Sequence, residues 1–272
     1  MTRIAVVGGG RIGEALVAGL LEAGRAPKDL VVVETLAPRA AQLAERFKVR
    51  VTGSTADAVV GADIVVIAVK PNVVDSVLAD LSKADLDSGS DQVLVSLAAG
   101  ITTGHLESKL PAGFAVVRVM SNTPMLVGQG MSVLSPGRYA KPEQLEVVGE
   151  MLEAVGKVVT VPETQMDAVT AVSGSGPAYF FLVVEAMIDA GVGLGLTREV
   201  ATELVVQTMI GSAALIDESG QNAVDLRAAV TSPGGTTAAA LRELERGAIR
   251  STFIEALQAA KRRSVEQGAS SE

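Results

Sequence analysis

Short apolar runs alternate with amphipathic stretches along the first half of the chain. Five runs rich in Val and Ile are almost free of polar residues, as in strands buried on both faces of a parallel sheet. They cover residues 4–7, 30–33, 64–69, 93–97 and 115–119. Helical spacing between them covers residues 12–23, 38–47, 73–81 and 103–110. This alternation predicts a doubly wound parallel sheet with right-handed crossovers. Two further strands are expected at residues 131–134 and 157–161, with a helix after Pro142 between them.

Only helical patterns follow the last predicted strand. They cover residues 164–171, 177–190, 198–216, 237–244 and 252–262. We therefore predict an α/β protein with two domains, a sheet domain at residues 1–161 and an all-helical domain at residues 162–272. The polar tail from Glu266 onward is expected to fray.

The predicted helix at residues 177–190 is apolar on every side. The side chains from Tyr179 to Val184 are consecutive apolar residues, so this helix must be covered all round. It is either the central helix of its domain or part of a dimer interface. The interface is favoured, because a small helical domain cannot easily cover such a helix alone. A membrane span is rejected, since Glu185 and Asp189 would lie in lipid.

Composition and charge exclude several classes of function. Of 272 residues, 48% are hydrophobic and 20% charged, as in a globular protein, and the net charge of −8 without a basic block argues against nucleic acid as a partner. The chain has no cysteine and a single histidine, so thiol chemistry is excluded and no metal site is expected. That histidine, His105, is interpreted as a surface or packing residue. The N-terminus lacks a signal-peptide pattern, and we expect a cytoplasmic protein.

A glycine fingerprint follows the first predicted strand directly. Gly8, Gly10 and Gly13 form a G-x-G-x-x-G element that opens the first predicted helix. The first glycine permits a tight turn, the second lets the backbone approach a pyrophosphate, and the third lets helix and strand pack closely. The start of the helix favours the anion, because its N–H groups are unpaired and its dipole is positive there. We predict a dinucleotide site formed by Gly8, Gly9, Gly10, Arg11, Ile12 and Gly13.

Glu34 bears on which dinucleotide binds. It ends the second predicted strand, where an acidic side chain binds the ribose 2′-hydroxyl of NAD and repels the 2′-phosphate of NADP. Arg39 is close enough in sequence to bend back towards such a phosphate, and Glu34 has a second interpretation as a solvated residue before a helix. The cofactor is therefore NADPH or NADH, and Glu34 favours NADH.

Two other predicted strands end in residues suited to a cofactor. Ala68, Val69, Lys70 and Pro71 end one of them, and Leu97, Ala98 and Ala99 end the other. Open α/β sheets bind ligands at the carboxyl ends of their strands, and small residues there let a nicotinamide ring lie against the backbone. Lys70 has a second interpretation as an ordinary surface lysine.

Two glycine-rich segments in the helical half offer a different kind of site. Residues 173–177 and 231–237 each place backbone N–H groups and hydroxyls at the start of a predicted helix, and Pro177 suits a first helical position. Such a start binds a small carboxylate without an arginine. Capped turns between helices have the same pattern, so the residues alone leave both interpretations open.

Six motifs occur in one order along the chain. They are Gly8-x-Gly10-x-x-Gly13, Ala68-Val69-Lys70-Pro71, Met120-Ser121-Asn122-Thr123-Pro124, Asp167-Ala168-Val169-Thr170, Ser173-Gly174-Ser175-Gly176-Pro177-Ala178 and Ser232-Pro233-Gly234-Gly235-Thr236-Thr237. In this order and spacing they resemble the pyrroline-5-carboxylate reductase family. The resemblance covers nearly the whole chain, and the two glycine-rich motifs of the helical half are its most specific part.

The resemblance implies a Rossmann-type domain followed by a helical dimerisation domain, with the active site completed across the dimer. In many members five such dimers form a decamer. It implies that Thr237 hydrogen-bonds the ring nitrogen as the catalytic residue. The other implied substrate-binding residues are Ser232, Gly234, Gly235, Thr236, Ser175 and Glu163. Asn122 is assigned to the cofactor site. Glu34 and Thr55 depart from the family's pattern near the adenosine, which leaves the cofactor preference open.

The implied reaction is hydride transfer from NAD(P)H to the C=N bond of Δ1-pyrroline-5-carboxylate, giving L-proline in proline biosynthesis. A protonated imine is already electrophilic, so the enzyme needs mainly to orient the two rings. A rival class, the β-hydroxyacid dehydrogenases, use a lysine of their helical domain, and none occurs here between Lys157 and Lys261. A non-catalytic dinucleotide sensor is the other alternative, and it would not need two further ligand loops.

Overall fold

The computed structural model describes residues 2–84 and 91–269 and divides into two compact units. Unit 1 is formed by Met1–Ser175 and Ala260–Glu272, and unit 2 by Gly176–Ala259. The last helix, α12 (Ile249–Ala269), therefore contributes to both units. The domain boundary after residue 161 stays a prediction: the last strand, β8, ends at Thr160, and the two units part after Ser175.

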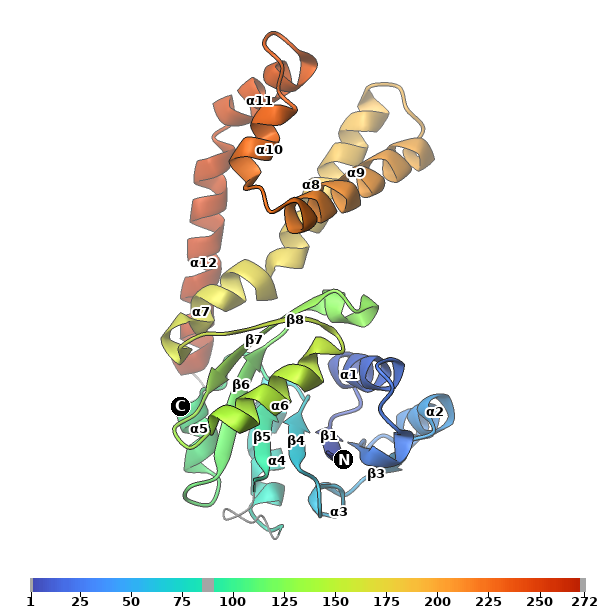
Figure 1. Ribbon diagram of the computed structural model, residues 1–272, viewed down its shortest axis with the longest axis vertical. Coiled ribbons are helices and arrows are strands. Elements are labelled where there is room, and N and C mark those ends of the chain that lie inside the picture. Colours follow the sequence, from blue (N-terminus) through green and yellow to red (C-terminus); the bar gives the residue numbers. More distant parts are fainter. Residues whose placement is uncertain (1, 85–90, 270–272) are drawn as a thin grey trace. The chain divides into compact units, whose positions relative to one another are not determined.

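Unit 1 is built on one eight-stranded sheet with the order β3-β2-β1-β4-β5-β6-β7-β8 (Figure 1). Its strands are β1 (Ile4–Val7), β2 (Leu30–Val33), β3 (Arg50–Thr52), β4 (Ile64–Ile67), β5 (Val93–Ser96), β6 (Ala115–Met120), β7 (Gly130–Pro136) and β8 (Gly156–Thr160). Neighbouring strands from β3 to β6 are all parallel. The chain winds from β1 out to β3 and then returns to β4 beside β1, which confirms the Rossmann-type arrangement.

The sheet departs from a wholly parallel one at β7. This strand pairs antiparallel with β6, while β8 runs parallel to β7. Residues 121–129, which join β6 to β7, hold only the short helix η3 (Thr123–Val127). A parallel neighbour needs a crossover of about a dozen residues or more, so this connection is too short for one. At this pair the observed direction differs from the predicted parallel one.

Two sets of helices cover the two faces of the sheet. On one face, α1 (Arg11–Glu22), α2 (Ala37–Phe47) and α6 (Pro142–Glu153) bury apolar side chains against a first core. On the other face, α3 (Thr55–Val59), α4 (Val74–Leu81) and α5 (Thr103–Ser108) do the same against a second core. Neighbouring strand residues serve different cores, as Val6 and Val7 do in β1. This double burial explains why the strands read as unbroken apolar runs.

Helices alone follow β8 in the described part of the chain, as predicted. Within unit 1 they are η4 (Glu163–Gln165), α7 (Met166–Val169) and the π-helical turn η5 (Thr170–Gly174). Unit 2 contains α8 (Gly176–Gly193), α9 (Arg198–Ser219), α10 (Ala223–Ala229), α11 (Thr236–Arg246) and the first part of α12. The chain from Glu266 continues as helix to Ala269 rather than fraying there, and residues 270–272 lie outside the described residues.

Unit 2 leaves a large apolar surface on α8 and α9. Phe180, Phe181 and Leu182 are 59–65% exposed, and Leu204 and Ile210 of α9 are more than half exposed. By length and composition, the helical stretches Glu163–Gly193 and Arg198–Ser219 are apolar enough to cross a membrane, and each is 11% buried over the window that qualifies. An apolar surface of this kind marks an interaction site.

Candidate active site

The carboxyl ends of four neighbouring strands lie level along one edge of the sheet. The register pairs Val7 with both Val33 and Ile67, and Ile67 with Ser96. The predicted cofactor residues therefore come together at this edge: Gly8–Gly13 after β1, Glu34 after β2, Ala68–Pro71 after β4, and Leu97–Ala99 after β5. The chain reverses its winding direction between β1 and β4, and open α/β sheets bind ligands at this kind of switch point.

The glycine fingerprint has the shape that a pyrophosphate needs. Gly8 has φ of +114°, and a Cβ there would lie 2.8 Å from the carbonyl oxygen of Ala68. A Cβ on Gly13 would lie 2.0 Å from the carbonyl oxygen of Gly8, whereas one on Gly10 would meet nothing within 4 Å. Gly10 also caps α1 without a side-chain hydrogen bond, so no side chain occupies the start of the helix. The loop is closed on the protein side and open where an anion would bind, which fits a dinucleotide.

Glu34 and Arg39 both lie against Gly9. The Glu34 carboxylate accepts a hydrogen bond from the N–H of Leu36 at 2.8 Å, and its other oxygen would lie 2.9 Å from a Cβ on Gly9. The Nε of Arg39 donates to the carbonyl oxygen of Gly9 at 2.9 Å, and its Nη2 pairs with Glu14 of α1. The arginine thus bends back towards the fingerprint, as the sequence allowed, but a carboxylate holds it there.

The other residues assigned to the cofactor site differ in their exposure to solvent. Lys70 is exposed after β4, while Ala98 is buried after β5. Thr55 is 9% exposed in the first turn of α3. Asn122 bridges two backbone segments, because its Nδ2 donates to the carbonyl oxygen of Ser173 at 3.0 Å and its Oδ1 accepts from the N–H of Met131 at 2.9 Å. Cofactor contacts of Thr55 and Asn122 stay predictions.

Glu163 belongs to a largely buried ion pair. Arg118 of β6 is 5% exposed and donates from Nη1 to Oε1 of Glu163 at 3.1 Å. The N–H of Thr103 donates to the same oxygen at 2.7 Å, and the hydroxyl of Thr103 donates to Oε2. Both oxygens of Glu163 therefore tie η4 to β6 and α5. Its predicted contact with substrate stays a prediction, and its partner Arg118 was not predicted, although one arginine within a run of valines was a signal.

The first glycine-rich segment of the helical half is a helical turn rather than a loop. Residues Thr170–Gly174 form the π-helical turn, closed by the N–H of Ser175 donating to the carbonyl oxygen of Thr170 at 2.8 Å. A Cβ on Gly174 would lie 2.2 Å from Cε of Met120, so glycine permits this close approach. The N–H of Ser175 is thus used inside the turn. The expected run of free N–H groups in this segment was therefore wrong at Ser175. Such turns occur frequently at functional sites.

The second glycine-rich segment, in unit 2, opens α11 as predicted. The N–H of Gly235 donates to the carbonyl oxygen of Ser232 at 3.1 Å, and Gly234 has φ of +72°. Gly235 caps α11 without a side-chain hydrogen bond. No side chain therefore caps the helix start at Thr236 and Thr237, whose first N–H groups can bind a carboxylate.

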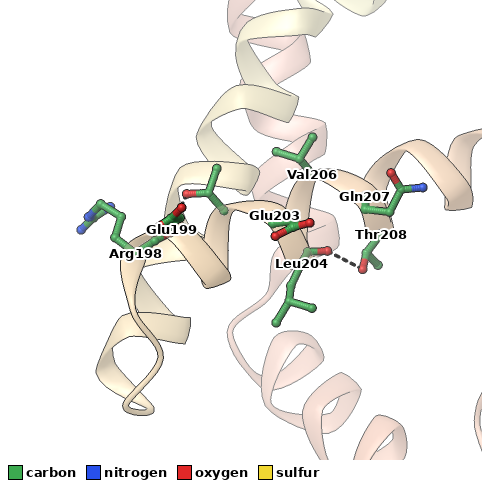
Figure 2. Close-up of a pocket in the computed structure, with 8 residues that line it drawn as sticks. Arg198, Glu199, Glu203, Leu204, Val206, Gln207 and Thr208 are labelled. Carbon is green, nitrogen blue, oxygen red and sulfur yellow. Dashed lines mark hydrogen bonds between the residues drawn. The ribbon is translucent and has the colours of Figure 1, made fainter.

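Two other kinds of functional site were considered, a metal centre and a pocket on α9. Within residues 2–84 and 91–269, no three His, Asp or Glu side chains gather as metal ligands do. A pocket of about 700 Å³ lies along α9 (Figure 2) and is lined by eight residues between Arg198 and Thr208. None of them is a predicted site residue, and Leu204, whose carbonyl oxygen accepts from the hydroxyl of Thr208, is half exposed. We assign this pocket to the uncovered apolar surface of unit 2.

Comparison with known proteins adds independent findings. Residues 163–267 match the sequence model described as pyrroline-5-carboxylate reductase dimerisation, and residues 3–100 match that of NADP oxidoreductases dependent on coenzyme F420. A pyrroline-5-carboxylate reductase from Mycobacterium tuberculosis is 57% identical over 97% of this chain and 96% of its own. A solved structure of such a reductase from Coxiella burnetii is 37% identical, with a TM-score of 0.93 and 98% of both chains covered. The Plasmodium falciparum pyrroline carboxylate reductase with NADP bound is 31% identical, with a TM-score of 0.86 over 98% of both chains.

Proposed function

Because this chain belongs to the pyrroline-5-carboxylate reductase family, we propose that it reduces the C=N bond of Δ1-pyrroline-5-carboxylate to give L-proline, the final step of proline biosynthesis. It is an NAD(P)-dependent oxidoreductase. The main support for this proposal is that the chain has two preformed anion sites. One is the glycine fingerprint at the start of α1, and the other is the uncapped start of α11.

The start of α11 binds the carboxylate of the substrate. The backbone N–H groups of Gly234 and Thr236 supply the donors, with the N-terminal end of the helix dipole behind them. Ser232 and Gly235 form the turn that presents these groups, since the N–H of Gly235 donates to the carbonyl oxygen of Ser232. Thr237 then donates from its hydroxyl to the nitrogen of the neutral imine, or relays a proton towards it. When bound, the nicotinamide cofactor supplies the hydride. The chain's own contribution is to orient the imine and keep a proton at its nitrogen, so no strong acid or base is needed.

Thr237 provides the test of this assignment. Loss of one well-placed donor typically lowers the rate by about 10²–10³-fold. We expect Thr237→Ala to lower kcat/KM for pyrroline-5-carboxylate by that order, while NADH binding is kept. Thr237→Ser retains the hydroxyl and is the matched control, expected to keep most of the activity. An unchanged kcat/KM in Thr237→Ala would remove Thr237 from the mechanism.

The preferred cofactor is NADH. Glu34 places a carboxylate against Gly9 beside the fingerprint, where it accepts a ribose hydroxyl and repels a 2′-phosphate. Arg39, which could offset that charge, is paired with Glu14. Glu34→Gln keeps the size of the side chain and its acceptor for Leu36, so the expected result is a rise in kcat/KM with NADPH relative to NADH. Equal kcat/KM with both cofactors in the unmodified enzyme would contradict the preference.

The enzyme self-associates through its helical region. The exposed apolar faces of α8 and α9 are covered by a second copy rather than by lipid, since Glu185 and Asp189 lie on α8 and the latter pairs with Arg198 at 2.7 Å. This dimer completes the active site and is the building block of a decamer. Analytical ultracentrifugation without detergent tests both the dimer and the decamer, which are expected as soluble species. The protein acts in the cytoplasm, independently of nucleic acid and membranes.

A further inference from the structure

Glu14 holds two arginines of the neighbouring helix. It lies in the first turn of α1, directly after Gly13, and its carboxylate pairs with Nη2 of Arg39 and, at 2.5 Å, with Nη1 of Arg46. The side chains of Glu14 and Arg39 are only 19% and 29% exposed, whereas that of Arg46 is 66% exposed. The pair with Arg39 is therefore the less hydrated of the two and the one that fixes a side-chain position.

Arg39 lies against the glycine fingerprint, beside Glu34. Its Nε donates to the carbonyl oxygen of Gly9, and Glu34 lies against the same glycine. The two side chains that distinguish a ribose hydroxyl from a ribose phosphate thus meet at one residue of the fingerprint. Arg39, however, faces two acceptors already, Gly9 and Glu14, so its Nε and Nη2 donors are occupied before any ligand binds.

We propose that Glu14 sets the cofactor preference of this enzyme by holding Arg39 against α1, away from the ribose 2′ position that Glu34 guards. In the unmodified enzyme, a 2′-phosphate meets the carboxylate of Glu34 and a guanidinium whose Nε and Nη2 are already bound to Gly9 and Glu14. In Glu14→Gln, Nη2 of Arg39 is released and can pair with the phosphate, which is a strong and geometrically specific interaction. Glu14 is a positioning residue that acts through Arg39. The proposal rests on the proposed function, because it concerns the same cofactor site.

The experiment compares two fragments of the cofactors, 2′,5′-ADP and 5′-AMP, by calorimetry on Glu14→Gln. One charge-assisted hydrogen bond corresponds to roughly tenfold in affinity. We expect 2′,5′-ADP to bind about tenfold more tightly to this variant, with the affinity for 5′-AMP changed less than twofold. The ratio of kcat/KM with NADPH to that with NADH should rise in parallel. Adding Arg39→Gln to Glu14→Gln should abolish both effects.

Glu45→Gln is the matched control. Glu45 is exposed and lines the same surface pocket as Glu14 and Arg39, and this substitution removes the same charge as Glu14→Gln. If the affinity for 2′,5′-ADP rose equally in Glu45→Gln, the loss of one negative charge, and not the release of Arg39, would explain the increase. That result would overturn the proposal. So would an unchanged fragment ratio, or equal weakening of both fragments, in Glu14→Gln.

Arg39→Gln alone gives a test that does not depend on the folding of a Glu14 variant. Because Nε and Nη2 of Arg39 are held by Gly9 and Glu14, its loss should change 2′,5′-ADP binding less than twofold. A several-fold loss would show that Arg39 contacts the phosphate in the unmodified enzyme, and would overturn the proposal. The unmodified enzyme's own preference for NADH is a separate result: it tests the assignment of Glu34, whereas the change on substitution tests Glu14.

Discussion

Replacing Glu163 with alanine should destabilise the enzyme through the guanidinium that it leaves behind. Arg118 is 5% exposed, and among the described residues it keeps no carboxylate partner once Glu163 is removed. The N–H and hydroxyl of Thr103 lose their acceptor in the same step. The substitution therefore leaves a buried charge and two polar groups unpaired, while removing little apolar contact.

The magnitude follows from the burial of the pair. Removing one partner of a buried ion pair costs about 3–5 kcal/mol. The side chain of Glu163 is 29% exposed, so water can reach part of the vacated space, and we take the lower end, about 3 kcal/mol. For a unit of this size that corresponds to a fall in Tm of about 6–12 °C. Glu163→Gln retains an acceptor for Thr103 and should be affected about half as much.

Urea unfolding followed by circular dichroism measures the free energy, and initial rates measure KM for pyrroline-5-carboxylate. Glu146→Ala, an exposed acidic residue of α6, is the control and should change stability by less than about 0.5 kcal/mol. A structural role for Glu163 is excluded if Glu163→Ala unfolds at the same urea concentration as the unmodified enzyme while KM rises strongly. That result would make Glu163 a direct substrate ligand, as the family resemblance implies.

Three further outcomes are expected. Gly13→Ala should weaken NADH binding at least tenfold in a fluorescence titration, since its Cβ would lie 2.0 Å from the carbonyl oxygen of Gly8; unaltered binding would mean that the loop is not held as described. Phe181→Glu should dissociate the dimer in light scattering, because Phe181 is 63% exposed in the single chain and must be buried in the assembly; a dimer that survives would move the interface elsewhere. His105→Gln should leave turnover nearly intact, because the Nε2 of His105 lies 2.6 Å from Asp75 and links two helices; a loss beyond tenfold would give His105 a catalytic role.

The sheet was predictable wherever the local sequence carries the whole signal. β1 and β2 have the predicted bounds, since four buried residues followed by a glycine or a charge define each one. β3, at Arg50–Thr52, has three residues and only one of them is apolar, so it forms because β2 offers a neighbouring edge. The direction of β7 was missed for a related reason, because it depends on the length of a connection rather than on an apolar pattern.

In the candidate site, too, local motifs were predictable from the sequence, whereas contacts between distant residues were not. The fingerprint and the start of α11 are local motifs, and the structure has them where they were expected. The pairing of Glu14 with Arg39 depends on how α1 lies against α2, and that of Arg118 with Glu163 joins residues far apart in the chain. No pattern within a helix or strand encodes such contacts. The use of the Ser175 N–H inside a π-helical turn was hidden likewise, since glycine and serine there also suit a loop.

Transfer of deuterium from the cofactor to proline would show the proposed reaction itself. The enzyme is incubated with pyrroline-5-carboxylate and NADH doubly deuterated at C4, and the product is analysed by mass spectrometry and NMR. We expect L-proline carrying one deuterium at C5, formed in step with the oxidation of NADH. A folded protein that binds NADH but yields no proline, or proline without deuterium at C5, would contradict the proposed reaction.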